Sequence, residues 1–103
     1  MCYWASANKY GEPAALSRLL SKPTMILLTG GTSGIGLELV RMLLDEGHTV
    51  IVLARRASGL ADALGLANGL TGYDCDLADV SVLRRVMEQI ANAHPEISVI
   101  INN

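Results

Sequence analysis

The sequence predicts an α/β domain built on a doubly wound parallel sheet, and three observations carry this prediction. Two apolar runs, residues 25–29 and 50–54, have the continuous apolar character of strands that are covered on both faces. Segments with apolar residues at helical spacing stand between and after such runs. A glycine-rich turn, TGGTSGIG at residues 29–36, joins the first run to the first of these segments. Regular alternation of strands and helices indicates right-handed crossovers in a parallel sheet.

The first helix is expected directly after the glycine-rich turn, with Gly47 as its C-terminal cap. Its apolar residues at helical spacing are Ile35, Leu39, Val40, Leu43 and Leu44. A second helix is expected over residues 59–66, and a third strand over residues 71–75.

A long helix is expected between the third strand and a fourth strand at residues 98–101. Asp79 or Ser81 is expected to cap its start, and His94-Pro95 to end it. Its predicted apolar face consists of Val82, Val86, Ile90 and Ala93. The expected fold is a Rossmann-like sheet, truncated to about four strands in the order 3-2-1-4.

Composition limits the classes of protein that this chain can represent. Of its 103 residues, 50% are hydrophobic and 17% charged, which indicates one globular domain. The net charge of -2, without a long run of one sign, argues against nucleic acid or an anionic membrane as a partner. No apolar stretch reaches the roughly 18 residues of a membrane span, and the N-terminus lacks the features of a secretory signal. Cys2 and Cys75 have no metal-ligand spacing, so the sequence predicts a cytoplasmic protein with free thiols and no metal site.

Residues 1–24 lack the patterning of the rest of the chain. They are expected to be an N-terminal leader, either irregular or containing a short helix that starts near Pro13. The patterned domain is expected over residues 25–103.

The glycines of the turn have a physical use at the start of a helix. The helix N-terminus presents free backbone N–H groups and a partial positive charge, and glycine leaves room for a phosphate to approach them. Gly30, Gly34 and Gly36 therefore suit a pyrophosphate, and Gly36 is further expected to let the helix pack closely on the strand. The literal GxGxxG pattern is absent because Leu39 takes the third glycine position, and no Gly-Lys-Ser/Thr is present to form a P-loop.

The turn also matches the TGxxxGIG signature, so that the chain resembles the classical short-chain dehydrogenases/reductases over residues 25–103. Asp76-Leu77 after the third strand and Asn102-Asn103, where the family has NNAG, extend this resemblance. It implies a partial NAD(P)-binding Rossmann domain in which Asp76 binds the adenine amino group, Leu77 contacts the ring, and Asn102 supports the sheet and lines the cofactor ribose. The implied phosphate-binding turn comprises Thr29, Gly30, Thr32, Ser33, Gly34, Ile35 and Gly36.

The end of the second strand decides which cofactor is expected. Enzymes that use NAD usually carry an acid there, which binds the ribose 2′-hydroxyl, whereas an arginine accommodates the 2′-phosphate of NADP. In this chain Arg55 and Arg56 follow the strand. Arg55 is expected to pair with the 2′-phosphate, helped by Ser33, with Arg56 as the second candidate. NADP is favoured over NAD, and the alternative is that the two arginines belong to a solvated turn.

The family transfers hydride between a nicotinamide cofactor and a carbonyl or alcohol substrate, using a serine, a tyrosine and a lysine four residues after the tyrosine. Four residues beyond the three tyrosines of this chain stand Ala7, Ala14 and Leu77. No catalytic residue is therefore assigned, and whether the chain is itself an enzyme stays open. The resemblance implies the NADP(H)-binding part of an oxidoreductase; the alternative is a noncatalytic nucleotide-binding module or a degenerate gene fragment.

The fourth strand is expected to form an exposed apolar edge of the truncated sheet. Such an edge presents unpaired backbone groups to other chains. A homo-oligomer or aggregation through this edge is therefore expected.

Overall fold

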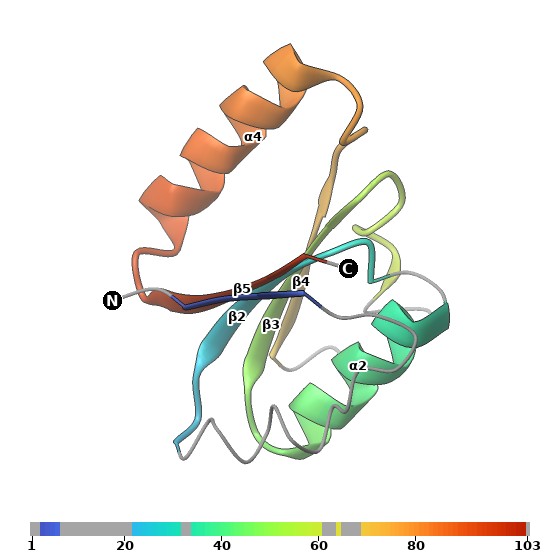
Figure 1. Ribbon diagram of the computed structural model, residues 1–103, viewed down its shortest axis with the longest axis vertical. Coiled ribbons are helices and arrows are strands. Elements are labelled where there is room, and N and C mark those ends of the chain that lie inside the picture. The colour runs from blue at the N-terminus through green and yellow to red at the C-terminus, as the bar shows by residue number, and fades with distance from the viewer. Residues whose placement is uncertain (1–2, 7–21, 32–33, 61–63, 65–68, 103) are drawn as a thin grey trace.

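The computed structural model describes residues 3–6, 22–31, 34–60, 64 and 69–102. Its centre is a five-stranded sheet in the order β1-β5-β2-β3-β4, in which every pair of neighbours is parallel. The strands are β1 (Tyr3–Ser6), β2 (Met25–Thr29), β3 (Thr49–Ala54), β4 (Leu70–Asp74) and β5 (Ile97–Asn102). Two helices, α2 (Gly34–Asp45) and α4 (Val80–Ala93), lie on opposite sides of this sheet (Figure 1).

The predicted four-strand arrangement is confirmed. The four strands expected from the sequence are β2, β3, β4 and β5, and they lie in the order β4-β3-β2-β5, which is the 3-2-1-4 order of a Rossmann-like sheet. The bounds of β2 agree with the prediction, and those of the other three differ by one residue at one or both ends. Apolar runs predicted β2, β3 and β5, whereas β4 (LTGYD) contains no such run and the strand order came from the Rossmann-like arrangement.

The strand β1 departs from the expectation of an irregular leader. It pairs with β5 from Tyr3 opposite Val99 to Ser6 opposite Asn102, so the two strands run side by side (Figure 1). The physical reason is that the edge of a sheet pairs through backbone groups, which any extended segment can supply without an apolar pattern. The expectation that β5 would be an exposed edge is therefore wrong. The short helix expected near Pro13 lies outside the described residues.

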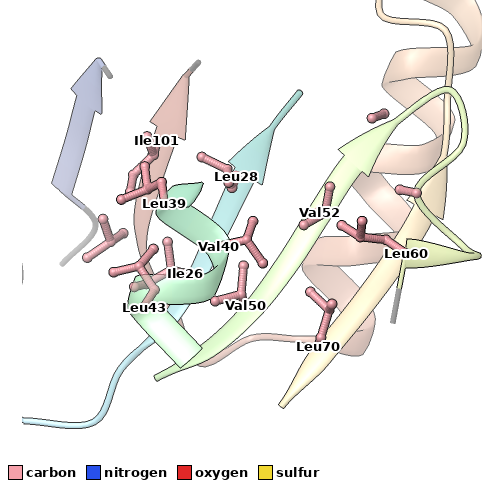
Figure 2. Packing of buried hydrophobic residues seen from close by; sticks show 13 residues of the cluster. Ile26, Leu28, Leu39, Val40, Leu43, Val50, Val52, Leu60, Leu70 and Ile101 are labelled. Carbon is pink, nitrogen blue, oxygen red and sulfur yellow. The ribbon is translucent and has the colours of Figure 1, made fainter. Parts of the chain in front are cut away.

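One layer of the core lies between α2 and the sheet. Leu39, Val40 and Leu43 of the helix face Ile26 and Val50 of the strands, as Figure 2 shows, and all five side chains are buried. Burying one such side chain contributes about 1.5 to 3 kcal/mol. The helix that follows the glycine-rich turn is thereby fixed on the sheet.

The second layer lies between α4 and the opposite face. Leu27, Ile51 and Leu53 pack there with Ile90 of the helix. Successive strand residues point to opposite faces, so Leu27 belongs to this layer although its neighbour Ile26 belongs to the first. Coverage on both faces explains why the strands read as continuous apolar runs.

The predicted helix ends are confirmed where the structure describes them. Gly47 follows α2 and donates its backbone N–H to the Leu44 carbonyl oxygen at 3.0 Å. Asp79 caps α4. The apolar face of α4 differs from the prediction at three residues. Ala93 is exposed, and Leu83 and Met87 join Val82, Val86 and Ile90 on the side that packs against the sheet. Of the helix expected at residues 59–66, only Leu60 and Leu64 are described as helical, and the remainder lies outside the described part of the chain.

The cap at Asp79 makes the stability of α4 depend on pH. Hydrogen bonds from the Ser81 hydroxyl and the Val82 backbone N–H hold the pKa of the Asp79 carboxyl below its usual range. A lowered pKa in the folded state means that the stabilisation is present above the unfolded value of about 3.9 and is lost as the pH falls through the folded value. We therefore expect Asp79→Ala to melt at a lower temperature than the parent at pH 7, with the difference disappearing in strong acid.

Asp79→Asn is the matched control for this prediction, because asparagine caps helices about as well as aspartate but does not titrate. Thermal melts between pH 2 and 7 should show a parent-like melting temperature for this variant at pH 7. As the pH falls, its melting temperature should decrease less than that of the parent, because its cap does not titrate. Identical pH profiles for the alanine variant and the parent would contradict the assignment.

Candidate functional site

A cavity lies beyond the carboxyl ends of the central strands, where open α/β sheets bind their ligands. Its volume is about 820 Å³, which falls within the range of about 300 to 1,000 Å³ typical of small-molecule sites. The described residues that line it are Gly30, Ala54, Arg55, Arg56, Cys75, Asp76 and Leu77. They come from the segments that directly follow β2, β3 and β4 and from the last residue of β3.

The glycine-rich turn enters this cavity at Gly30. Gly30 and Gly34 have φ values of +71° and +58°, a conformation that glycine adopts without the steric cost of a side chain. The Gly30 backbone N–H donates to the Leu53 carbonyl oxygen at 3.0 Å, which ties the turn to β3. This hydrogen bond fixes the start of the turn, directly after β2, against the end of β3.

Close packing of this turn depends on Gly31, which the sequence analysis did not single out. A Cβ atom there would lie 2.9 Å from Leu28 Cδ2, 3.0 Å from Val40 Cγ2 and 3.2 Å from Val52 Cγ1. Gly36, for which close packing was predicted, is buried in the first turn of α2. The sequence did contain a signal for Gly31. The TGxxxGIG signature allows any residue at this position, so a glycine there suggests that a side chain would not fit.

A side-chain contact joins the ends of β2 and β5. The Thr29 hydroxyl donates to Asn102 Oδ1 at 2.9 Å, and the two residues are partners in the sheet register. Neither residue belongs to the described lining of the cavity. The contact holds the two strands together at the point from which the glycine-rich turn departs.

Two positive charges stand at the end of β3. Arg55 and Arg56 are exposed and line the cavity together with Gly30. Neither forms an ion pair with any acidic residue in the part of the chain that the structure describes. Both guanidinium groups are therefore available to an anion in the cavity.

The segment that follows β4 provides another part of the cavity wall. Asp76 accepts the Ala78 backbone N–H at 3.0 Å, which folds the segment back as an Asx turn. The side chain of Leu77, 39% exposed, offers an apolar surface next to this carboxylate. This combination of an acceptor and an apolar surface suits a flat heterocycle that carries an amino group.

Cys75 also lines the cavity but has the character of a structural thiol. Its side chain is buried, and burial raises the pKa of the thiol, with further increases from the negative charges of Asp76 and Asp79. A raised pKa disfavours the thiolate, which is the nucleophilic form. The cavity therefore contains no activated cysteine among its described residues.

Of the predicted site residues, the structure brings together five in the cavity wall: Gly30, Arg55, Arg56, Asp76 and Leu77. Gly34, Ile35 and Gly36 form the first turn of α2, while Thr32 and Ser33 lie outside the described residues. Ala54 and Cys75 were missed because they carry no polar motif. Their positions at strand ends were the signal that could have found them.

Both histidines of the chain lie at turns and take part in side-chain hydrogen bonds. His48 is buried, and its Nδ1 accepts the Thr24 backbone N–H at 3.1 Å. His94 is half-buried and its Nε2 lies 2.8 Å from the Tyr73 hydroxyl. Each histidine fastens a turn to a neighbouring segment, which turn composition does not reveal.

Within the described ranges no three His, Cys, Asp or Glu residues are grouped as a metal site would require, and no described helix has the length and apolarity to cross a bilayer.

Comparison with known families agrees with this architecture. Residues 24–103 match the family model of the short chain dehydrogenases. The chain belongs to this family of oxidoreductases.

Two relatives show how far the similarity extends along the chain. The uncharacterized oxidoreductase DltE of Bacillus subtilis (strain 168) is 37% identical over 78 residues, which cover 76% of this chain and 31% of that protein. The 3-oxoacyl-(acyl-carrier-protein) reductase MabA of Mycobacterium avium is 35% identical over 98 residues, which cover 95% of this chain and 33% of that protein. The chain thus spans about a third of the length of these relatives.

Solved structures share the fold. A short-chain dehydrogenase from Streptomyces avermitilis superimposes with a TM-score of 0.70 at 25% identity, covering 80% of this chain and 31% of that one. A short chain dehydrogenase from Leptospira borgpetersenii with bound NAD+ gives a TM-score of 0.65 at 22% identity, covering 79% of this chain and 31% of that one. The second similarity concerns the fold alone.

Proposed function

We propose that this chain is the NADP(H)-binding part of a short-chain dehydrogenase/reductase. The observation that carries the proposal is the cavity at the strand ends, in which the Gly30 turn and the two arginines face the same space. The backbone N–H groups at the start of α2 would hold the pyrophosphate, and Gly30, which has no side chain, would leave room for it. Asp76 and Leu77 would receive the adenine.

The preference for NADP over NAD rests on the end of β3. An acidic residue at this place selects NAD by binding the 2′-hydroxyl, and an arginine accommodates the 2′-phosphate instead. Arg55 stands there with no ion-pair partner among the described residues. A charge-assisted contact with a phosphate is roughly twice as strong as a neutral hydrogen bond. A solved structure of the same fold, the Leptospira borgpetersenii short chain dehydrogenase, holds NAD+, so the proposed preference is based on the residues at the end of β3 and not on the fold.

In the complete enzyme, the nicotinamide would supply hydride transfer to or from a carbonyl or alcohol substrate. The 103 residues contain no tyrosine followed by a lysine four positions later, so the groups that move the proton in this chemistry are not assigned to them. Their part in the reaction is to bind and orient the dinucleotide. We further propose that the protein is cytoplasmic, which the free thiol of Cys75 supports.

Calorimetric titration of the chain with NADP and NAD tests the proposal. We expect NADP to bind more tightly, and Arg55→Asp to weaken NADP binding by about 10- to 100-fold, the range for a lost hydrogen bond to a charged group. Arg84→Asp is the matched control, because it makes the same charge change on exposed α4, outside the described lining of the cavity. Equal affinities for NAD and NADP would contradict the proposed specificity, and binding of neither would leave a degenerate fragment.

A further inference from the structure

Asp74, the last residue of β4, binds the turn at residues 55–58, which contains Arg55 and Arg56 and is called the arginine turn below. The Asp74 carboxylate accepts two hydrogen bonds from Ser58: the backbone N–H donates to Oδ1 at 2.7 Å and the hydroxyl donates to Oδ2 at 2.7 Å. Both oxygens of one carboxylate are therefore engaged by one residue of the turn. Such hydrogen bonds to an ionised acceptor are among the strong ones in proteins.

A second attachment lies immediately before the arginines. The Cys75 backbone N–H donates to the Ala54 carbonyl oxygen at 2.9 Å. Arg55 and Arg56 are thus flanked by two fixed points. On one side Ala54 is hydrogen-bonded to Cys75, and on the other Ala57 is buried and Ser58 is hydrogen-bonded to Asp74. The two attachment points on the β4 side are consecutive residues, which leaves the arginine turn little freedom to swing away from the cavity.

The approach of this turn to β4 requires Gly72. A Cβ atom at this position would overlap the carbonyl group of Ala57 and would lie 2.8 Å from the Ser58 nitrogen. The turn therefore crosses directly over the strand at a place where only a hydrogen atom fits. Gly72, Asp74 and Ser58 together fix the height and the direction of the arginine turn.

We propose that Ser58 and Asp74 are positioning residues for cofactor specificity, which hold the arginine turn so that Arg55 meets a 2′-phosphate in the cavity. This inference rests on the proposed function, since it concerns the same cavity. Fixing the turn before the ligand arrives removes an ordering cost from binding. Only ligands with a 2′-phosphate bind more tightly because the turn is fixed in advance, since the rest of the dinucleotide contacts other segments.

The charge of Asp74 makes the inference testable through the sign of an effect. A carboxylate next to an anion site repels the anion, so a purely electrostatic role predicts tighter NADP binding when the charge is removed. A positioning role predicts weaker binding when the contacts to Ser58 are removed. Asp74→Ala removes the charge and the contacts, whereas Asp74→Asn removes the charge but keeps an acceptor and a donor for Ser58.

The experiment measures the dissociation constants of NADP and NAD for the parent, Ser58→Ala, Ser58→Thr, Asp74→Ala and Asp74→Asn, with circular dichroism melts to verify folding. We expect both alanine variants to bind NADP about 3- to 10-fold more weakly, in line with the loss of one or two hydrogen bonds, and to bind NAD as the parent does. Ser58→Thr keeps the hydroxyl and should restore NADP binding. Asp74→Asn should bind NADP at least as well as the parent.

The outcomes separate this inference from the function on which it rests. If the parent prefers NADP and the alanine variants keep its ratio of NAD to NADP dissociation constants, the positioning role is wrong and the proposed function stands. Equal weakening of both ligands would show a general structural role and would also overturn the inference. A parent that binds neither dinucleotide would overturn both proposals.

Discussion

Replacing Gly72 with alanine is expected to lower the free energy of unfolding by about 3 kcal/mol, the upper part of the usual range for overpacking. The added methyl group would overlap the Ala57 carbonyl, which is backbone and cannot rotate away as a side chain would. The turn cannot simply lift, because Ala57 is buried and Ser58 is bound to Asp74. Either β4 or the arginine turn must move, and the variant should also lose its preference for NADP.

Urea denaturation of Gly72→Ala beside Gly59→Ala provides the measurement and its control. A Cβ atom at Gly59 has no neighbour within 4 Å, so that variant should stay within about 0.5 kcal/mol of the parent. Equal stability of the two variants would mean that the arginine turn does not cross β4 as closely as described.

The second large effect is expected from the strand at the other side of the sheet. Replacing residues 3–6 with glycine and serine should remove β1 and leave the backbone groups of β5 unpaired along one side. We expect the variant to self-associate at concentrations where the parent is monomeric, because an uncovered strand accepts a strand from another chain. Light scattering after size exclusion would measure at least twice the parent mass.

The length of the chain is the same in this variant and the parent, so a difference in mass reports on the strand itself. A monomeric variant with the parent's melting temperature would show that β1 does not protect the edge. Association of both proteins would show that four paired residues are too few to cover β5.

The predictable part of the fold is the part in which one residue pattern implies one environment. The strands β2 and β3 each contain an unbroken run of buried apolar residues because both faces are covered, so these runs identify the strands without further information. β1 has no such pattern, because pairing with β5 uses backbone groups that every residue possesses. It joins the sheet because the edge of β5 would otherwise have unpaired backbone N–H and C=O groups, and the sequence of residues 3–6 contains no sign of this.

The candidate site divides in the same way. Gly30 and Arg55 were predicted because their chemistry suits a dinucleotide and because they stand at strand ends, and Asp76 was predicted from the resemblance to the family. Gly72 and Asp74 could not be found by such reasoning, since their importance arises from a crossing of the turn after β3 over β4. That crossing is a tertiary relation between segments about 16 residues apart, a separation that the Ser58 to Asp74 contact illustrates.

The pairing of β1 with β5 also bears on the order in which the chain acquires its structure. The ribosome synthesises Tyr3 long before Val99, the residue opposite it. β1 therefore stays unpaired while β2, β3 and β4 are synthesised. The entropic cost of closing a loop grows only slowly with its length, but contacts between distant residues form late. During that interval the first segment is an unpaired strand whose intended neighbour does not yet exist. A nascent chain that stalls before residue 97 would therefore carry its N-terminal strand exposed to chaperones or to strands of other proteins.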